Sequence, residues 1–339
     1  MRIVQIVPAG DPALGGVRGY AEALAGELSR RHGIESDLVS LGGRGDAGGA
    51  LAGALPGAST CLLHYVNYAY HPRGCPVGLV SDLRRWREGV PGRRLVTFFH
   101  EVYATGPFWR SSFWLSPVQR RLAAILARAS DRIATSLEIY GRMLARLGPR
   151  TQAVVTPVFS TVGEPEEVTG LAARAPRLLV FGGRGVRARA YGQEREALAA
   201  ACGALGTEEI VDLGPAIATP ARVDGVPVRA LGPLPATAVR EQLLGARAGF
   251  LAYPPAFLPK STIFAAYCAH GLVPVCAGSR NERRAGGGDP LYWAPGSPLP
   301  SADGLQALAS AAHSWYLPHS LTRQAEGFRD LLLAAGAAR

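Results

Sequence analysis

Short β-rich runs alternate with helical segments along the chain, and this alternation restricts the fold more than any other feature. In the first half, strands are predicted at 2–8, 35–41, 59–66, 92–101, 131–136 and 152–158. Helices are predicted between them at 17–33, 116–130 and 137–148. Strands that alternate with helices form a parallel sheet covered on both faces. The pattern therefore predicts an α/β fold.

Two helix ends carry local signals. Gly33 follows the first helix and is expected to end it. Ser116 and Pro117 are typical of an N-cap followed by the first helical residue, so the second helix is expected to begin there.

The alternation stops at 159–176, where turn formers and acidic residues predominate, and then begins again. Strands are predicted at 177–183, 208–214, 227–232, 248–253 and 272–278, and helices at 191–206, 235–247 and 260–271. The remainder is helical, with an interruption near Pro318. We predict two doubly wound, Rossmann-like parallel-sheet domains at 1–160 and 177–318, a linker at 161–176, and a C-terminal helix, 319–339, packing back on the first domain. Ligands of such folds bind in a cleft at the carboxyl ends of the strands.

The net charge of +10 favours anionic partners. The arginines are dispersed and no nucleic-acid-binding motif is evident, so phosphorylated small molecules are favoured over nucleic acid. Docking on an anionic membrane surface is compatible with the charge. His and acidic residues do not cluster at metal-ligand spacing, so no metal is expected. Five scattered cysteines and no signal-peptide pattern predict a cytoplasmic protein, with the inner face of the membrane as a further location.

Several segments together resemble the GT-B glycosyltransferases, in particular the retaining enzymes of glycosyltransferase family 4. They are GGVRGYAEALAGEL, VTFFHEVYATGPFW, LVFGGRG, GPLPATAVREQLLGARAGFLAYPP and AAYCAHGLVPV. The resemblance implies two Rossmann-like domains facing across a cleft, with the acceptor on the N-terminal side and the donor on the C-terminal side. It also implies a nucleotide-diphosphate sugar as donor substrate, a hydroxyl acceptor and no other cofactor.

The resemblance also implies site residues. Gly15, Gly16 and Arg18 would lie in the loop beneath the donor diphosphate. His100 would contact the donor sugar, and Glu101 would bind an acceptor hydroxyl or anchor the loop. Arg184 and Arg189 would bind the diphosphate, because arginine makes strong charge-assisted bonds to phosphate oxygens; Arg187 is the alternative to Arg189. The stretch HYVNYAYHPRG, 64–74, could bind a sugar acceptor or serve interdomain packing.

The chain departs from the family at one place. The family carries two glutamates eight residues apart before its A-x-G-x-PV ending, and here these positions fall on Ala266 and near Leu258. In their place stands a helix start with Lys260, the only lysine of the chain, followed by Ser261 and Thr262. A lysine at a helix N-terminus suits a diphosphate whose charge grows as the glycosidic bond breaks.

These observations predict a glycosyltransferase that acts with retention and without metal. Two alternatives stay open. The missing glutamates motivate the first, and the second remains because the fold alone does not name a reaction. One is a catalytically silent nucleotide- or glycan-binding homologue. The other is a GT-B nucleotide-sugar epimerase, which would need no acceptor.

Overall fold

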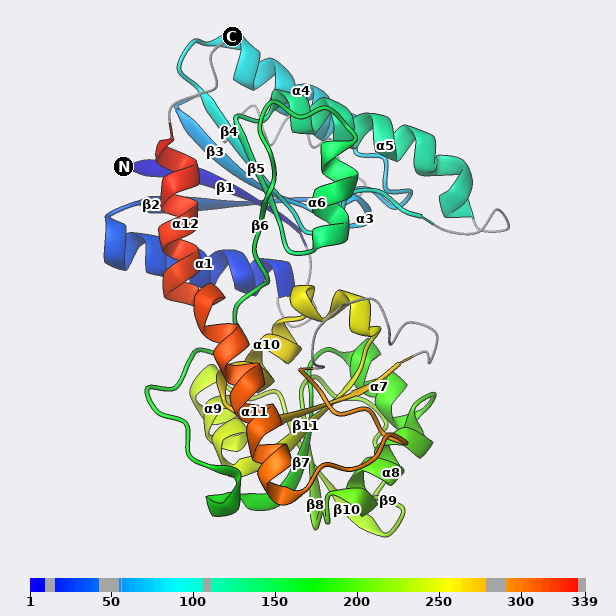
Figure 1. The fold of residues 1–339 in the computed structure, drawn as a ribbon. Helices are drawn as coiled ribbons and strands as arrows, with labels where there is room; N and C mark the ends of the chain where they lie inside the picture. Colours follow the sequence, from blue (N-terminus) through cyan, green and yellow to red (C-terminus); the bar gives the residue numbers. More distant parts are fainter. Residues whose placement is uncertain (10–15, 43–54, 56, 106–110, 279–290, 335–339) are drawn as a thin grey trace. The chain divides into compact units, whose positions relative to one another are not determined.

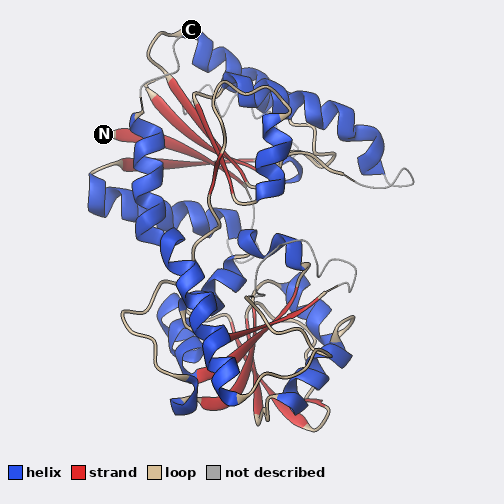
Figure 2. Ribbon diagram, viewed as in Figure 1, coloured by secondary structure: helices blue, strands red, loops and turns tan. Residues whose placement is uncertain are grey.

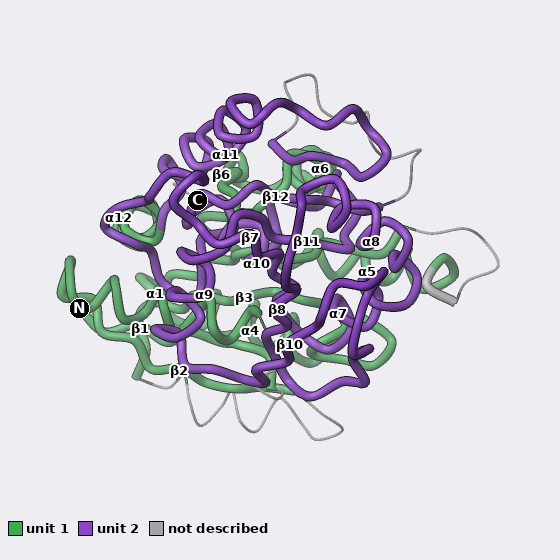
Figure 3. The backbone as a smooth tube through the Cα atoms, turned by 90° about the horizontal axis from the view of Figure 1, so that it is seen from below, with its two compact units in different colours: residues 1–157, 321–339 green, residues 158–320 purple. Residues whose placement is uncertain are grey.

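The computed structural model describes residues 1–9, 16–42, 55, 57–105, 111–278 and 291–334. Over these residues the chain forms two compact units (Figure 3). Unit 1 comprises Met1–Pro157 and Leu321–Arg339, and unit 2 comprises Val158–Ser320. Each unit contains one sheet with helices on both of its faces (Figure 2). The predicted α/β class, with two Rossmann-like parallel sheets, is confirmed.

The sheet of unit 1 has the order β2-β1-β3-β4-β5-β6, and its strands pair in parallel. Its strands are β1 (Arg2–Pro8), β2 (Glu35–Leu41), β3 (Thr60–Tyr65), β4 (Arg94–Phe99), β5 (Arg132–Thr135) and β6 (Val154–Val155). The strand order reverses between β1 and β3, and such switch points are where doubly wound sheets bind ligands.

Two layers of helices enclose this sheet (Figure 1). On one face lie α1 (Gly16–His32) and α12 (Leu321–Leu333). On the other lie α4 (Val77–Gly89), α5 (Ser111–Ala129) and α6 (Glu138–Ala145), while the short α3 (Asn67–Tyr70) follows β3. Gly33 ends α1 as predicted, with a φ of +60° that glycine adopts readily.

The sheet of unit 2 has the order β12-β11-β7-β8-β10-β9. Its strands are β7 (Ala175–Phe181), β8 (Glu209–Leu213), β9 (Arg222–Val223), β10 (Val226–Gly232), β11 (Ala246–Ala252) and β12 (Val273–Ala277). All pairs are parallel except β9 with β10. That hairpin was not predicted, although its turn residues, Asp224 and Gly225, are a strong hairpin signal and both have positive φ.

The faces of the second sheet are covered by different helices. Ala248 and Phe250 of β11 share a buried cluster with residues of α7 (Arg184–Tyr191) and α8 (Arg195–Ala204). Gly249 lies between them and faces the opposite side, where α10 (Thr262–Ala269) packs. The other elements of the unit are η1 (Leu171–Ala173), α9 (Ala236–Gly245), η2 (Pro255–Lys260), α11 (Ala302–Tyr316) and η4 (Leu317–His319).

Two predicted helix starts were wrong. α5 begins at Ser111 rather than Ser116, and Pro117 lies inside the helix. Pro117 is exposed, so water can solvate the helix carbonyl that the proline leaves without an amide partner. The helix predicted from 191 begins only at Arg195, because a separate helix, α7, precedes it and ends at Tyr191, with Gly192 as its C-cap.

The predicted linker, 161–176, lies within unit 2. Arg174 explains this placement, because its buried guanidinium donates to the carbonyl oxygens of Thr169, Ala246 and His270. These bonds tie the segment to β11 and to the end of α10. Burial lowers the pKa of Arg174 to about 10, so the side chain stays charged at neutral pH.

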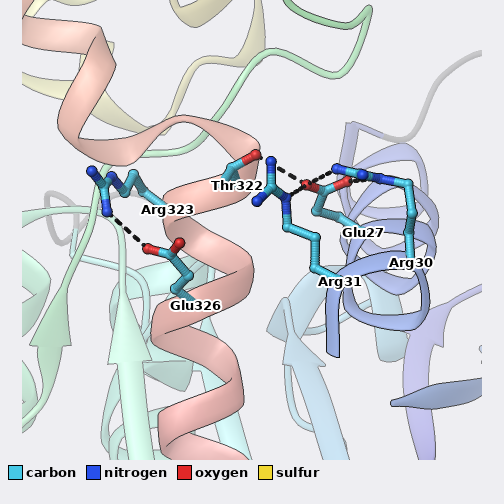
Figure 4. A network of polar contacts seen from close by, with 6 residues as sticks. All are labelled: Glu27, Arg30, Arg31, Thr322, Arg323 and Glu326. Atoms are coloured by element: carbon cyan, nitrogen blue, oxygen red, sulfur yellow. Dashed lines mark hydrogen bonds and ion pairs between the residues drawn. The ribbon is translucent and has the colours of Figure 1, made fainter. Parts of the chain in front are cut away.

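Hydrogen bonds join α12 to the rest of unit 1 although the two are far apart in sequence. The Glu27 carboxylate accepts bonds from Arg30, Arg31 and, across the helix pair, the Thr322 hydroxyl at 3.0 Å (Figure 4). Burial opposes ionisation of Glu27, but these bonds outweigh it and lower its pKa. Gln324 of the same helix accepts a bond from the Tyr20 hydroxyl and donates one to the Pro157 carbonyl.

Thr322→Val should weaken the attachment of α12 by removing the hydroxyl that donates to Glu27. We expect the free energy of unfolding to fall by about 1–2 kcal/mol, as measured by urea denaturation. Arg323→Ala is the matched control, because Arg323 is exposed and its ion pair among the described residues is with Glu326 on its own helix, so its loss should cost less than about 0.5 kcal/mol. Equal costs for the two variants would contradict a specific role for the Thr322 bond.

Candidate functional site

The strand order of unit 2 reverses between β7 and β11, and two helices begin beside the carboxyl ends of these strands. After β7 the chain passes through Gly182 and Gly183 into α7. After β11 it passes through η2 into α10. Helix N-termini carry unpaired amide groups and a positive dipole end. This edge of the sheet is therefore suited to bind an anion.

Glycines end three neighbouring strands at this edge. Gly182, Gly214 and Gly232 follow or end β7, β8 and β10, and all three have positive φ, at +129°, +143° and +71°. The amide of Gly182 donates to the Leu213 carbonyl, and that of Gly214 donates to the Gly232 carbonyl. A Cβ on Gly214 would lie 2.2 Å from the Gly182 carbonyl oxygen. The edge is thus formed by closely packed backbone.

The start of α10 is held tightly against this edge. A Cβ on Gly182 would lie 2.3 Å from Cδ1 of Ile263, so only glycine lets the two loops approach this closely. One turn later the Tyr267 ring fills the space above Gly249, where a Cβ would lie 2.5 Å away. The Tyr267 hydroxyl lies 3.1 Å from the Phe250 carbonyl oxygen and accepts from the Phe181 amide. Tyr267, which the sequence analysis did not identify, therefore fixes α10 to both switch-point strands.

Lys260, Ser261 and Thr262 occupy the start of this helix as predicted. Lys260 is the last residue of η2, and its ammonium group lies 5.6 Å from the Phe257 ring centroid. The preceding carbonyl, of Pro259, accepts a 2.8 Å bond from the Val158 amide. Ser261 is the N-cap, and its hydroxyl oxygen accepts from the Phe264 amide at 3.2 Å. The Ser261 hydroxyl hydrogen and the first amides of α10 are further donors at this edge.

The three arginines of α7 have different surroundings. Arg184 is the first residue of the helix, is exposed, and donates to the Ala216 carbonyl at 3.3 Å. Arg187 is buried and makes a bidentate ion pair with Asp212 of β8, together with a 2.6 Å bond to the Pro215 carbonyl. Arg189 is exposed in the last turn. The structure thus places Arg184 at the switch point, commits Arg187 to the core, and separates Arg189 from Arg184 by about 7.5 Å along the helix axis.

The two positions where the resembling family carries glutamates are apolar and buried. Leu258 lies in η2 with 5% of its surface exposed, and Ala266 lies in α10 with none. An apolar side chain cannot accept the hydrogen bonds that a carboxylate accepts. At these two positions the chain therefore lacks the hydrogen-bonding groups that the resembling family has.

The predicted residues of the first loop are only partly described. Gly15 lies outside the described residues, and Gly16 is the first residue of α1. Arg18, in the first turn of that helix, pairs with Glu22 at 2.8 Å and donates to the Ser40 hydroxyl of β2 at 2.8 Å. Arg18 thus links the start of α1 to the end of β2 within unit 1.

His100 follows β4 and belongs to a buried polar chain. One of its ring nitrogens, Nε2, lies 3.2 Å from Nδ1 of His64, and Nε2 of His64 lies 2.9 Å from Oε1 of Gln5. Tyr20 and Phe98 pack against the His100 ring. Burial lowers the pKa of His64 to about 3, so His64 is neutral at physiological pH. His64 was identified only as the start of a candidate acceptor stretch, and its alignment with Gln5 on neighbouring strands was not recognised.

Glu101 does not lie beside His100. Both residues lie beyond the end of β4, and the backbone amides of both donate to the Tyr65 carbonyl oxygen, at 3.0 and 3.3 Å. Burial, and then the Glu101 carboxylate, raise the pKa of Tyr140 on α6 to about 12. The two residues predicted together from the motif therefore serve opposite faces of the sheet.

The aromatic stretch after β3 is largely structural. Tyr65, Asn67 and Tyr70 are buried, and the Tyr70 hydroxyl lies 2.9 Å from the His64 carbonyl oxygen. Tyr68 is 39% exposed, but its hydroxyl accepts a bond from Gln119. Packing within unit 1 therefore accounts for most of these side chains.

Gly182→Ala should disturb the switch point, because it places a methyl group on Ile263 and forces a side chain into a positive-φ conformation. We expect the free energy of unfolding to fall by about 1–3 kcal/mol. Gly183→Ala is the matched control: its φ is −68°, and a Cβ there meets nothing within 4 Å. Its stability should stay within about 0.5 kcal/mol of the parent. Urea denaturation of both variants measures these free energies. A Gly182→Ala protein as stable as the parent would show that the contact between Gly182 and Ile263 does not require glycine.

No protein-family model matches the chain, and no curated protein matches it in sequence. Solved structures do match. HepE of Anabaena, in complex with UDP and glucose, has a TM-score of 0.62 at 12% identity, over 99% of this chain and 100% of that one. Sucrose-phosphate synthase of Thermosynechococcus elongatus has a TM-score of 0.60 at 12% identity, over 98% and 100%. WaaG, a glycosyltransferase involved in lipopolysaccharide biosynthesis, has a TM-score of 0.55 at 13% identity, over 98% and 100%. The chain therefore has the two-sheet, Rossmann-like fold of these GT-B proteins.

Proposed function

We propose that this protein is a glycosyltransferase that moves a sugar from a nucleotide-diphosphate donor to an acceptor hydroxyl. The observation that supports it is the switch-point edge of unit 2, where the N-termini of α7 and α10 lie together with Arg184 and Lys260. Two helix N-termini and two cations form a strongly anion-binding arrangement. A nucleoside diphosphate carries enough negative charge, and is extended enough, to contact both helix N-termini and both cations.

In the proposed reaction, these groups hold the leaving diphosphate. As the glycosidic bond breaks, negative charge grows on the departing phosphate oxygen. The amides of the α10 N-terminus, the Ser261 hydroxyl and the Lys260 ammonium group stabilise that charge, and Arg184 holds the other phosphate. These groups do the work that Mg²⁺ does in metal-dependent transferases, so the proposed reaction needs no metal.

We further propose that the reaction proceeds with retention of configuration. The acceptor hydroxyl would attack from the face that the leaving group departs from, and the departing phosphate oxygen would take the acceptor proton. This route uses no dedicated protein base, which agrees with the apolar residues at Leu258 and Ala266. His100 is proposed to contact the donor sugar, as the resemblance implies.

UDP is the first nucleotide to test as the donor's leaving group. HepE, which shares the fold, has been solved with UDP and glucose bound.

A catalytically silent nucleotide-binding protein is the second candidate, and the buried, apolar positions 258 and 266 favour it. Such a protein would bind the nucleotide through the same edge of unit 2. It would release no nucleotide from a sugar donor, whatever acceptor is offered. Turnover therefore separates the two candidates.

Calorimetric titration with UDP, GDP, ADP, TDP and CDP, each with a chelator present, should show micromolar binding of one nucleotide. Lys260→Ala should weaken that binding by about 10- to 100-fold, because a charge-assisted bond to phosphate is lost. Arg189→Ala is the matched control, since it removes one positive charge from an exposed position at the other end of α7. Its affinity should stay within about twofold of the parent.

Donor turnover by the same variants completes the test. Nucleotide release from the matching sugar donor should persist in chelator and fall steeply in Lys260→Ala. Unchanged turnover in Lys260→Ala would end the assignment of the lysine, and loss of turnover in chelator would end the metal-independent mechanism. Binding without turnover would favour the silent homologue.

A further inference from the structure

Unit 2 contains a cavity at the amino ends of β7, β11 and β12, opposite to the edge where α7 and α10 begin. It encloses about 370 Å³, which lies within the range of small-ligand pockets, about 300–1,000 Å³. The starts of the three strands contribute Pro176, Ala248 and Val273 to its wall. The cavity is therefore separated from the proposed nucleotide site by the length of the strands.

Apolar side chains form most of the wall of this cavity. Besides the three strand residues, it is lined by Leu171 of η1, Leu205 after α8 and Leu305 of α11. An apolar group that moves from water into such a cavity gains free energy from its burial and from contacts with the wall. A sugar or a nucleotide would leave most of its polar groups without partners there. The wall therefore suits the apolar part of a ligand.

Two half-buried arginines on paired strands, Arg177 of β7 and Arg247 of β11, also line the cavity. Nε of Arg247 donates to the Arg174 carbonyl oxygen at 3.0 Å, and within the described part of the chain its two terminal nitrogens have no hydrogen-bond partner. Arg177 shares the Glu209 carboxylate with Arg229, so one negative charge there faces two positive charges. Both guanidinium groups can therefore bind an anion.

Two further polar side chains of the wall restrict the ligand. Gln306 is occupied within the protein, because its Oε1 accepts from the Leu171 amide at 2.8 Å and its Nε2 donates to the Ser310 hydroxyl at 3.2 Å. Asp303, in the first turn of α11, brings a negative charge to the cavity. Two arginines and one aspartate leave one positive charge, which matches an anion with a single charge. Asp303 would repel a doubly charged phosphate more strongly.

We propose that this cavity is a second ligand site, for a small amphipathic carboxylate whose head group binds Arg177 and Arg247 and whose alkyl chain contacts the apolar wall. A carboxylate can accept two parallel hydrogen bonds from one planar guanidinium group. An acyl carboxylate of short or medium length has both the head group and the tail that the cavity requires. The site does not depend on the proposed transferase reaction, because the ligand occupies the opposite end of the same strands.

Calorimetric titration of the full chain with octanoate, octanol and octylammonium tests the head group. Octanoate should bind with saturation, and the other two should bind about tenfold more weakly, because neither carries a negative charge. Hexanoate should also bind about tenfold more weakly than octanoate, because it buries two fewer methylene groups. Octylammonium binding as tight as that of octanoate would overturn the charge argument. Absence of saturable binding for hexanoate, octanoate and decanoate would overturn the site itself.

Charge variants test the role of the arginines. Arg247→Ala should weaken octanoate binding about tenfold, because an ion pair in half-buried surroundings is lost. Arg222→Ala is the matched control, since Arg222 is an exposed arginine of the same unit that also donates to a backbone carbonyl, that of Gly225. Its affinity should stay within about twofold of the parent. Asp303→Asn should strengthen binding about two- to threefold. Equal affinities in Arg247→Ala and Arg222→Ala would contradict the assigned head-group contact.

A pair of tryptophan variants tests the location. Ala172 and Ala173 are both exposed in η1, and of the two only Ala172 lines the cavity. Ala172→Trp should occupy the cavity and abolish octanoate binding, whereas Ala173→Trp should keep the affinity within about twofold of the parent. Urea denaturation verifies that both variants are folded. Octanoate binding by Ala172→Trp with the affinity of the parent would show that the ligand binds elsewhere.

Discussion

The close approach of α10 to the carboxyl ends of β7 and β11 is the constraint on which the candidate site of unit 2 depends. Two glycines permit it: Gly182 makes room for Ile263, and Gly249 makes room for Tyr267. The Tyr267 hydroxyl then bonds to the backbone of both strands. Because α10 is fixed in this way, its N-terminus lies at the switch point. The 3₁₀ turn η2, which precedes α10, ends with Lys260 and so brings this lysine to the same edge.

Two of the many arginines have a structural role that their hydrogen-bond partners explain. Arg174 and Arg187 are buried, and each binds backbone carbonyl oxygens, with Asp212 as a further partner of the second. A planar group with five donors is well suited to tie separate loops together in this manner. Arg187, in α7, is therefore neutralised by Asp212, whereas Arg174 is used internally at the amino ends of β7 and β11. The lone lysine, Lys260, is a compact cation at the end of η2.

The sequence predicts the fold well because its periodicities are strong. The strands other than β9, and α1, α9, α10 and α12, follow from alternating and helical patterns, and comparison with the resembling family draws attention to the helix start at Lys260. It predicts other features less well, each for a physical reason. α7 has alternating arginines and small residues, so its apolar period is weak, and only its packing against β7 and β11 shows it to be a helix. The pairing of His64 with Gln5 depends on register between strands that are 59 residues apart in sequence.

The return of α12 to unit 1 makes that unit discontinuous in sequence. Phe328 packs against Phe98 under the sheet, and Gln324 bonds to Tyr20. A gene fragment ending at Pro157 would therefore encode a sheet with one apolar face covered by α1 alone, and such a fragment should aggregate. Unit 2, in contrast, is a single continuous stretch of chain. Anyone dissecting the protein can express residues 158–320 as one piece, but must supply residues 321–334 to the first piece, through a designed connection or as a separate peptide.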